Sequence, residues 1–187
     1  ADLASYPTDI ISDVEILSSI SKKLILFMPR KDEIYSGNII SDSYNFGNLD
    51  MYMEGKYRKN HFQGVATIVQ KLFEIVNADN VYFGEKDFQQ LRIIEELVKK
   101  LRLKLNIIRC ETIRTKGGLA LSSRNKKLDI SSQKIATNLF KALSFAKNNF
   151  NRWDVVKVHE KIQAFLKTFP EINIEYSQDA ALEGYTN

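Results

Sequence analysis

The sequence predicts an α/β protein, with a parallel sheet that carries helices on its faces and a smaller C-terminal domain of α+β structure. Three short apolar runs, at Leu24–Met28, Val81–Phe83 and Leu105–Cys110, alternate with stretches whose apolar residues recur at helical spacing. Right-handed crossovers between parallel strands bring the carboxyl ends of the strands to one edge, where ligands bind. Beyond the third run the composition changes, so we predict domains at residues 1–112 and 113–187.

The composition is that of an ordinary globular protein, with 44% hydrophobic and 27% charged residues in 187. The net charge of +4 is spread along the chain, which permits a phosphorylated substrate and does not favour nucleic acid. A single cysteine, Cys110, excludes an internal disulfide and is expected to be buried, and with two histidines it argues against a zinc site. The chain shows no apolar run near the ~18 residues of a membrane span and no signal peptide, so we expect a cytoplasmic protein with no membrane partner.

The N-terminal part is predicted to hold one helix and one strand. Thr8 is suited to cap a helix over Ile10–Ile20, whose apolar residues fall on one face. Leu24–Met28 is uniformly apolar, which predicts a fully buried parallel strand ended by Pro29. Residues 30–54 are polar and interrupted by glycines, so we expect irregular or weakly stranded structure there.

The middle of the chain carries the strand–turn–helix unit around which the rest is organised. A helix is expected to begin at His61. Val81–Phe83 predicts a buried strand that Gly84 stops, and apolar spacing over residues 87–101 predicts the helix after it. Leu105–Cys110 predicts a further buried strand.

The C-terminal part is predicted to be mainly helical. Ser131 or Ser132 is expected to cap a helix that runs to Asn149, and Trp153–Thr168 has the spacing of another helix. Ile172–Tyr176 predicts a short strand.

Lys86 is the first candidate for binding an anion. A strand, a glycine turn and a helix together aim free backbone N–H groups at a ligand, and a lysine there lies at the positive end of the helix dipole. A bound anion would remove that penalty. The alternative is that Lys86 and Asp87 form a solvated turn.

A second candidate follows the glycine pair at residues 117–118. Ser122, Ser123 and Arg124 offer hydroxyl donors and a guanidinium that can grip phosphate oxygens, as a mobile clamp. The alternative is an ordinary surface turn.

Polar donors also precede one helix and open another. The segment from Arg58 to His61 suits an anion, or is a solvated basic turn. Gln89 and Gln90 are either exposed helix surface or amides that recognise a substrate hydroxyl or carboxylate. The sequence shows no serine–histidine–acid arrangement, Walker loop or close carboxylate pair, so the chemistry would depend on charge stabilisation and positioning.

Four motifs, in order and at matching spacing, resemble the pantoate–β-alanine ligase (pantothenate synthetase) family over residues 3–169. They are Met53–Arg58, His61–Val65, Tyr82–Leu91 and Gly117–Asn125. The resemblance implies a Rossmann-like sheet of the nucleotidyltransferase superfamily with a C-terminal lid. It also implies an ATP-dependent ligase in which pantoate forms pantoyl adenylate, β-alanine then displaces AMP, Mg²⁺ accompanies the triphosphate, and the protein is a homodimer.

The same resemblance implies roles for residues of the central unit. Gly84 and Asp87 match contacts to adenosine, with Asp87 accepting from the ribose hydroxyls. Lys86 matches the residue on the phosphates, and Gln90 the residue that orients pantoate.

Other family roles fall on the second candidate and on the segment before residue 62. Ser122, Ser123 and Arg124 match the grip on the phosphates. Arg58 and His61 match a motif near the pantoate and β-alanine end, although Lys59-Asn60 stands where the family usually has Pro-Gly.

The chain also departs from the family pattern. It has neither the His-x-Gly-His signature nor the Asn-Pro-x-Gln-Phe segment, and it stops short of the C-terminal hairpin. In the family's strand order of 3-2-1-4-5, two strands would separate Leu24–Met28 from Val81–Phe83. We therefore expect a part of a longer protein that by itself binds ATP weakly and does not turn over. The alternatives are a non-catalytic module for dimerisation or scaffolding, or another adenylating enzyme of the superfamily.

Overall fold

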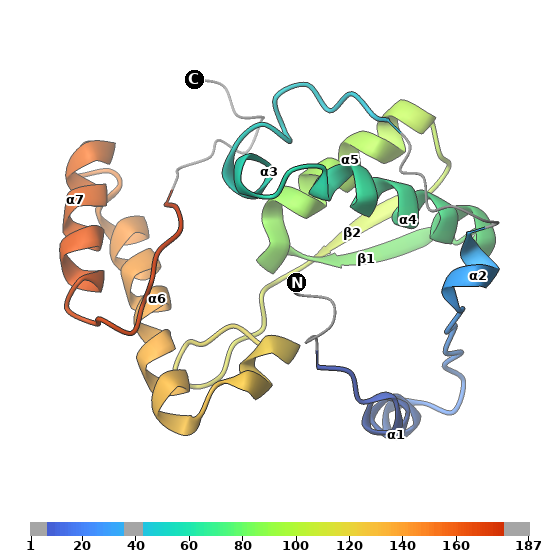
Figure 1. Ribbon diagram of the computed structural model, residues 1–187, viewed down its shortest axis with the longest axis horizontal. Helices are drawn as coiled ribbons and strands as arrows, with labels where there is room; N and C mark the ends of the chain where they lie inside the picture. The colour runs from blue at the N-terminus through green and yellow to red at the C-terminus, as the bar shows by residue number, and fades with distance from the viewer. Residues whose placement is uncertain (1–6, 36–42, 178–187) are drawn as a thin grey trace. The chain divides into compact units, whose positions relative to one another are not determined.

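The computed structural model describes residues 7–35 and 43–177. It divides into two compact units, one made of residues 1–40 and 122–129 and the other of residues 41–121 and 130–187. Figure 1 shows the elements in chain order. The boundary predicted at residue 113 stays a prediction.

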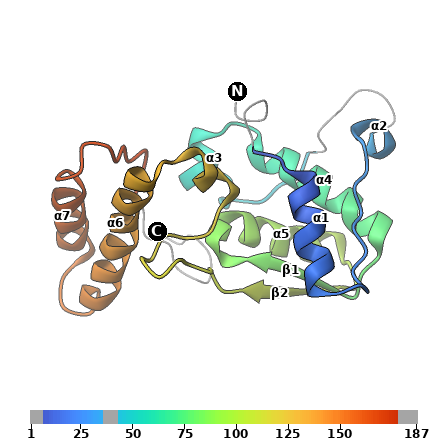
Figure 2. The ribbon, with the colours of Figure 1, turned by 90° about the horizontal axis from the view of Figure 1, so that it is seen from below.

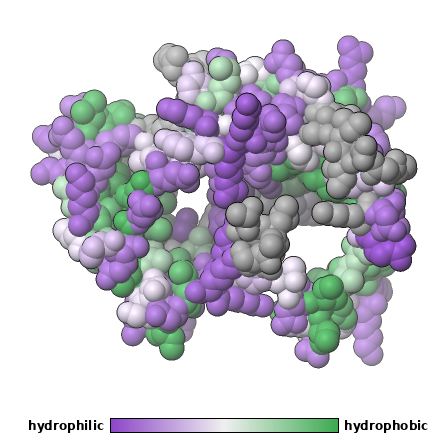
Figure 3. Space-filling model, in the orientation of Figure 1, coloured by the Kyte–Doolittle hydropathy of each residue, from purple (hydrophilic) through white to green (hydrophobic). Residues whose placement is uncertain are grey.

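In the first unit, helix α1 spans Ile10–Ile20 as predicted, but its cap is one residue later than expected. The carboxylate of Asp9, not the hydroxyl of Thr8, accepts the backbone N–H of Ser12 at 3.1 Å. None of the α1 residues is buried. Figure 3 shows the resulting hydrophobic surface over this helix.

The buried strand predicted at Leu24–Met28 is wrong. The segment has no regular secondary structure, and Ile25 is 94% exposed. An apolar run becomes a strand only where a neighbouring strand pairs with its backbone, and among the described residues none does so here. Helix α2, Lys31–Ile34, follows in a segment predicted to be irregular, and residues 36–42 of that segment lie outside the described part.

The second unit contains the parallel sheet that the sequence predicts. Strand β1, Asn80–Gly84, pairs in parallel with β2, Asn106–Cys110, with Val81 opposite Ile107. The strand ends at Gly84 as predicted, although the φ of this glycine, −74°, is ordinary and does not itself require glycine.

Helices α4, His61–Val76, and α5, Phe88–Leu101, lie on one face of this sheet (Figures 1 and 2). On that face the ring of Phe83 meets Phe73 of α4 edge to face at 6.3 Å. Side chains alternate along a strand, so the preceding residue, Tyr82, points to the opposite face and is 69% exposed. The strands are thus half-buried, and Cys110 is only partly buried.

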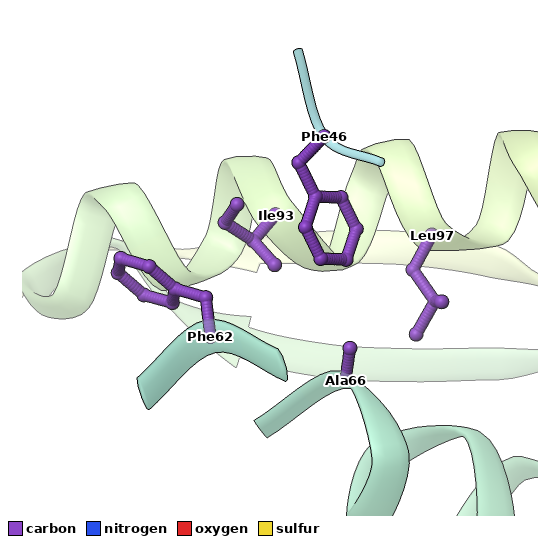
Figure 4. Packing of buried hydrophobic residues seen from close by; sticks show 5 residues of the cluster. All are labelled: Phe46, Phe62, Ala66, Ile93 and Leu97. Carbon is purple, nitrogen blue, oxygen red and sulfur yellow. The ribbon is translucent and has the colours of Figure 1, made fainter. Parts of the chain in front are cut away.

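The core of this unit fills the space between α4 and α5. Figure 4 shows its five buried residues, which are Phe46, Phe62, Ala66, Ile93 and Leu97. Phe46 comes from the chain before α3, Met53–Tyr57, so the core also fixes that segment.

The C-terminal helices α6, Ile130–Asn149, and α7, Val155–Leu166, lie side by side in Figures 1 and 2 around a second core. Helix α6 begins one residue before the predicted serine caps, so both serines lie in its first turn. Ile172–Tyr176 is not a strand, because no described strand pairs with it.

Candidate functional site

The carboxyl end of β1 leads through a short 3₁₀ helix, η2 (Glu85–Asp87), into α5. Asp87 occupies the N-cap position of α5, yet its side chain makes no capping hydrogen bond. It instead accepts from the Lys86 ammonium at 3.0 Å. The helix therefore begins without a side-chain cap, beside a cation that is paired with its own neighbour.

Gly84 leaves open space at this strand end. A Cβ added to it would meet no atom within 4 Å, and its φ is not in the left-handed region. Neither local conformation nor close packing therefore requires glycine. The missing side chain leaves room for a ligand to approach the backbone.

Gln89 is buried, with 4% of its surface exposed, and it ties α5 to the segment before α4. Its amide nitrogen donates to the carbonyl oxygens of Leu49 at 2.7 Å and Tyr52 at 2.8 Å. Its amide oxygen accepts the backbone N–H of Glu54 at 3.0 Å. The expectation of exposed helix surface is wrong for Gln89, whose amide binds protein backbone.

A signal for this role was present in the sequence. Gln89 precedes Ile93 and Leu97 at intervals of four, which places it on the face of α5 that enters the core. A polar residue in that register must be hydrogen-bonded. Gln90, the residue matched to pantoate, is half-buried beside it.

The segment that Gln89 holds is tightly built. Met53 has a φ of +48°, which is uncommon outside glycine and asparagine. A Cβ on Gly55 would overlap the backbone carbonyl of Asp50. Gly55 is thus the one position of this turn where the packing demands glycine, and no periodic pattern in the sequence pointed to it.

This turn presents Glu54 to His61. The carboxylate oxygen Oε2 of Glu54 lies 3.6 Å from Nε2 of His61, and both side chains are partly exposed. Arg58 ends α3, and its backbone N–H donates to the Glu54 carbonyl at 2.7 Å. Asn60, at φ +60° before α4, adopts the left-handed backbone that glycine takes most easily and asparagine tolerates. The backbone N–H of His61 donates to the Arg58 carbonyl at 3.1 Å, and the roles of the two side chains stay a prediction.

A residue from the C-terminal segment joins this group. The ring of Tyr176 stacks on Tyr57, with centroids 5.2 Å apart and planes 11° from parallel. Burial, and then the negative charge of Glu54, raise the pKa of the Tyr176 phenol above its ordinary value. The phenol is therefore neutral and able to donate at physiological pH.

Ser122, Ser123 and Arg124 belong to the first unit, where they open the 3₁₀ helix η3 (Ser123–Lys127). The Ser122 hydroxyl accepts the backbone N–H of Arg124 at 3.3 Å, so it caps this turn. Ser123 and Arg124 are exposed. Their place at a phosphate stays a prediction.

The second glycine before this turn, Gly118, is closely packed. Gly118 is buried at φ +93°, and an added Cβ would lie 2.5 Å from the Phe140 ring. The guanidinium of Arg114 lies 4.0 Å from the centre of that ring and donates to the Gly118 carbonyl at 3.2 Å. These contacts make a fixed tight turn against α6.

Residues 7–35 and 43–177 contain no group of three or more His, Cys, Asp or Glu side chains placed to hold a metal ion. No helix within the same residues has the length and apolarity to cross a membrane.

Comparison with known proteins decides the family. The sequence model described as Pantoate-beta-alanine ligase matches residues 1–183. The chain belongs to the pantoate–β-alanine ligase family. A pantothenate synthetase of Flavobacterium psychrophilum is 40% identical over 182 residues, which are 93% of this chain and 64% of that protein. One of Azobacteroides pseudotrichonymphae is 41% identical over 175 residues, or 94% of this chain and 62% of that protein.

Solved structures of the family agree with the fold. The pantothenate synthetase of Thermus thermophilus superposes with a TM-score of 0.87 at 33% identity, covering 94% of this chain and 64% of that one. The pantoate-beta-alanine ligase of Francisella tularensis, described as a complex with beta-gamma ATP and beta-alanine, gives 0.75 at 34% identity, covering 88% and 61%. The chain thus spans 64% or less of the length of each of these four proteins. The fold class predicted from the sequence, a parallel Rossmann-like sheet of this superfamily, is confirmed.

Proposed function

We propose that the chain carries out the reaction of its family, the ATP-dependent condensation of pantoate with β-alanine. The single observation that supports this most strongly is the family match over residues 1–183, which includes all the motifs of the candidate site. In the reaction a pantoate carboxylate oxygen bonds to the α-phosphorus of ATP as the bond to pyrophosphate breaks. The β-alanine ammonium then loses a proton, its nitrogen bonds to the acyl carbon as AMP leaves, and the nitrogen loses a second proton to give the amide.

The strand end of β1 is the proposed ATP site. Gly84 offers the open approach that a nucleoside needs, since no atom lies within 4 Å of an added Cβ. On binding, Lys86 would exchange its contact with Asp87 for the phosphates, where an ammonium stabilises the charge that develops in the transition state. The Asp87 carboxylate, once released, would accept from the ribose hydroxyls. Gln90, on the next turn of α5, would orient pantoate.

The remaining roles are proposed on the family match. Ser122, Ser123 and Arg124 would grip the phosphates by hydroxyl donors and a bidentate guanidinium. Arg58 and His61 would lie at the pantoate and β-alanine end. Mg²⁺ would arrive with the triphosphate as part of the substrate, an arrangement that suits Mg²⁺ because it keeps several waters and binds few protein ligands.

The proposal extends to the setting of the reaction. We place it in the cytoplasm, with a homodimer as the assembly and small molecules, not nucleic acid, as the partners. The Francisella relative, whose description names beta-gamma ATP and beta-alanine, supports the choice of ATP and β-alanine as ligands here.

The test measures AMP release and ATP binding by the purified chain. AMP release that requires both pantoate and β-alanine, and falls strongly in Lys86→Ala, is the expected result for the ligase. AMP formed without pantoate would instead indicate another adenylating enzyme. ATP binding without AMP release is also the outcome expected above for a part of the ligase that binds ATP weakly and does not turn over. A rise in ATP affinity on adding pantoate would then indicate the ligase site, and its absence would favour the non-catalytic module. Loss of ATP binding would remove the nucleotide site itself.

A further inference from the structure

The Glu54 carboxylate is presented by a turn whose backbone is fixed from several sides. Gln89 makes hydrogen bonds to Leu49, Tyr52 and Glu54. Gly55 packs against the Asp50 carbonyl with no room for a side chain. Residues held in uncommon backbone conformations, such as Met53 at φ +48°, persist only where the surroundings over-determine them, and they cluster at functional sites.

The charge that this turn presents is accessible. The Glu54 side chain is 39% exposed and the His61 side chain 29% exposed, with 3.6 Å between Oε2 and Nε2. At that distance the two groups attract without closing a short hydrogen bond, so the carboxylate keeps capacity for a second donor. A carboxylate that is partly shielded from water binds an ammonium group more strongly than a fully solvated one.

Arg58, the C-cap residue of α3, gives the opposite charge. It follows Glu54 by four residues, and its backbone N–H bonds to the Glu54 carbonyl at 2.7 Å, so this stretch is one helical turn. Burial raises the pKa of the Tyr176 phenol, Glu54 raises it further and Arg58 lowers it, so the carboxylate and the guanidinium both lie near that ring. A carboxylate and a guanidinium so placed match a small zwitterion whose two charges are separated by a short carbon chain.

Aromatic rings lie on this helix beside the charged pair. Tyr57 stacks on Tyr176 at 5.2 Å, which brings the segment that follows α7 to α3. The Glu54 charge is close enough to Tyr176 to disfavour its phenolate. The stacked rings give the methylene groups of a short amino acid an apolar surface next to the two charges.

We propose that Glu54 binds the ammonium group of the amino-acid substrate beside His61, with Arg58 on the substrate carboxylate, and that Gln89 is the positioning residue that sets Glu54 in place. This rests on the proposed function for the identity of the amino acid, β-alanine. It adds to the family motif a substrate-binding carboxylate and the buried amide behind it.

The test uses the two histidines of the chain as probes in nuclear magnetic resonance. β-Alanine is titrated into the ¹⁵N-labelled protein, alone and with Mg·ATP, while the imidazole signals of His61 and His159 are followed. We expect a saturable shift of the His61 signal and none of the His159 signal. Propylamine, which keeps the ammonium, should shift His61 more weakly, and propionate, which lacks it, should leave the signal in place.

Two test variants and one control variant separate an effect on binding from an effect on structure. Glu54→Gln removes one charge-assisted hydrogen bond and should weaken β-alanine binding about tenfold. Glu96→Gln, which changes a glutamate paired with Lys100 on α5, is the matched control and should bind as the wild type does. Gln89→Ala should weaken β-alanine binding in folded protein while leaving ATP affinity unchanged. If Gln89→Ala does not fold, the Glu54→Gln comparison decides alone.

The inference is overturned if β-alanine shifts neither histidine under both conditions, if His159 responds equally, or if Glu54→Gln binds as tightly as the wild type. These outcomes are distinct from failure of the proposed function, because they concern amine binding alone. AMP release could still require pantoate and β-alanine with the amine bound elsewhere, and amine binding at Glu54 could be found in a chain that releases no AMP.

Discussion

Replacing Gln89 by alanine should cost a large share of the stability of the second unit. The change removes three hydrogen bonds from a side chain that is 4% exposed. Each such bond contributes about 0.5–1.5 kcal/mol net, and a buried partner left unpaired costs about 1–3 kcal/mol. Because the backbone around Tyr52 is partly open to water, we expect a loss of about 2–4 kcal/mol. The free energy of unfolding of a whole domain is only about 5–15 kcal/mol, so this loss is a large share of it.

The measurement is the free energy of unfolding from urea titration, followed by far-ultraviolet circular dichroism. Gln90→Ala is the matched control, since it removes the same side chain one position along α5 where the residue is only half-buried. We expect that control to change the free energy of unfolding by less than about 0.5 kcal/mol. A loss below about 1 kcal/mol for Gln89→Ala, or equal losses for the two variants, would refute the reasoning that Gln89 holds the turn.

Three further predictions follow from single features of the second unit. Gly55→Ala forces a methyl group onto a backbone carbonyl and should lower the free energy of unfolding, measured by urea titration, by about 1–3 kcal/mol. The control Gly64→Ala has open space around it inside α4 and should raise the free energy of unfolding by up to about 1 kcal/mol. Equal effects of the two variants would contradict the close packing at Gly55. Gly84→Ala should leave the unfolding curve unchanged and weaken ATP binding measured by calorimetry, and unchanged ATP affinity would place the nucleotide elsewhere. Tyr176 has a pKa raised above 10.0 in the folded state, so its stabilisation is complete below pH 10.0 and is lost as the pH rises through the raised pKa. Wild-type unfolding free energy should therefore fall more steeply above pH 10.0 than that of Tyr176→Phe, and parallel curves would show that the phenol is not shielded.

Local signals in the sequence predicted most of the helices and the paired strands β1 and β2 of the described part of the chain. Helices α1, α4, α5 and α7 follow from apolar spacing within single segments, and each lies within two residues of its predicted start. The runs at Leu24–Met28 and Ile172–Tyr176 have strand-forming composition but no pairing strand among the described residues. A strand depends on its neighbour, which the sequence of the strand itself does not contain.

The sequence pointed to candidate site residues where chemistry shows in the side chain, and their roles stay predictions, whereas it missed residues whose part depends on packing. Lys86, Arg58 and His61 were recognisable as donors in a family motif. Gly55 was not, because it matters only through a carbonyl that approaches it. The register of Gln89 indicated a buried polar residue but not the three backbone groups, far along the chain, that its amide binds. Gly118 was also not predictable from its residue type. Glycine is associated with flexibility, but here it packs closely against the Phe140 ring.

The exposed run Leu24–Met28 affects how self-association of this chain should be interpreted. Its five consecutive apolar residues, among them Ile25 at 94% exposure, form an exposed hydrophobic surface that favours non-specific aggregation as the protein concentration rises. Light scattering alone would then confuse colloidal aggregation with a genuine dimer of fixed stoichiometry. Placing a lysine at position 25 should disperse the aggregate and leave any specific dimer intact, so sedimentation of that variant gives the assembly state.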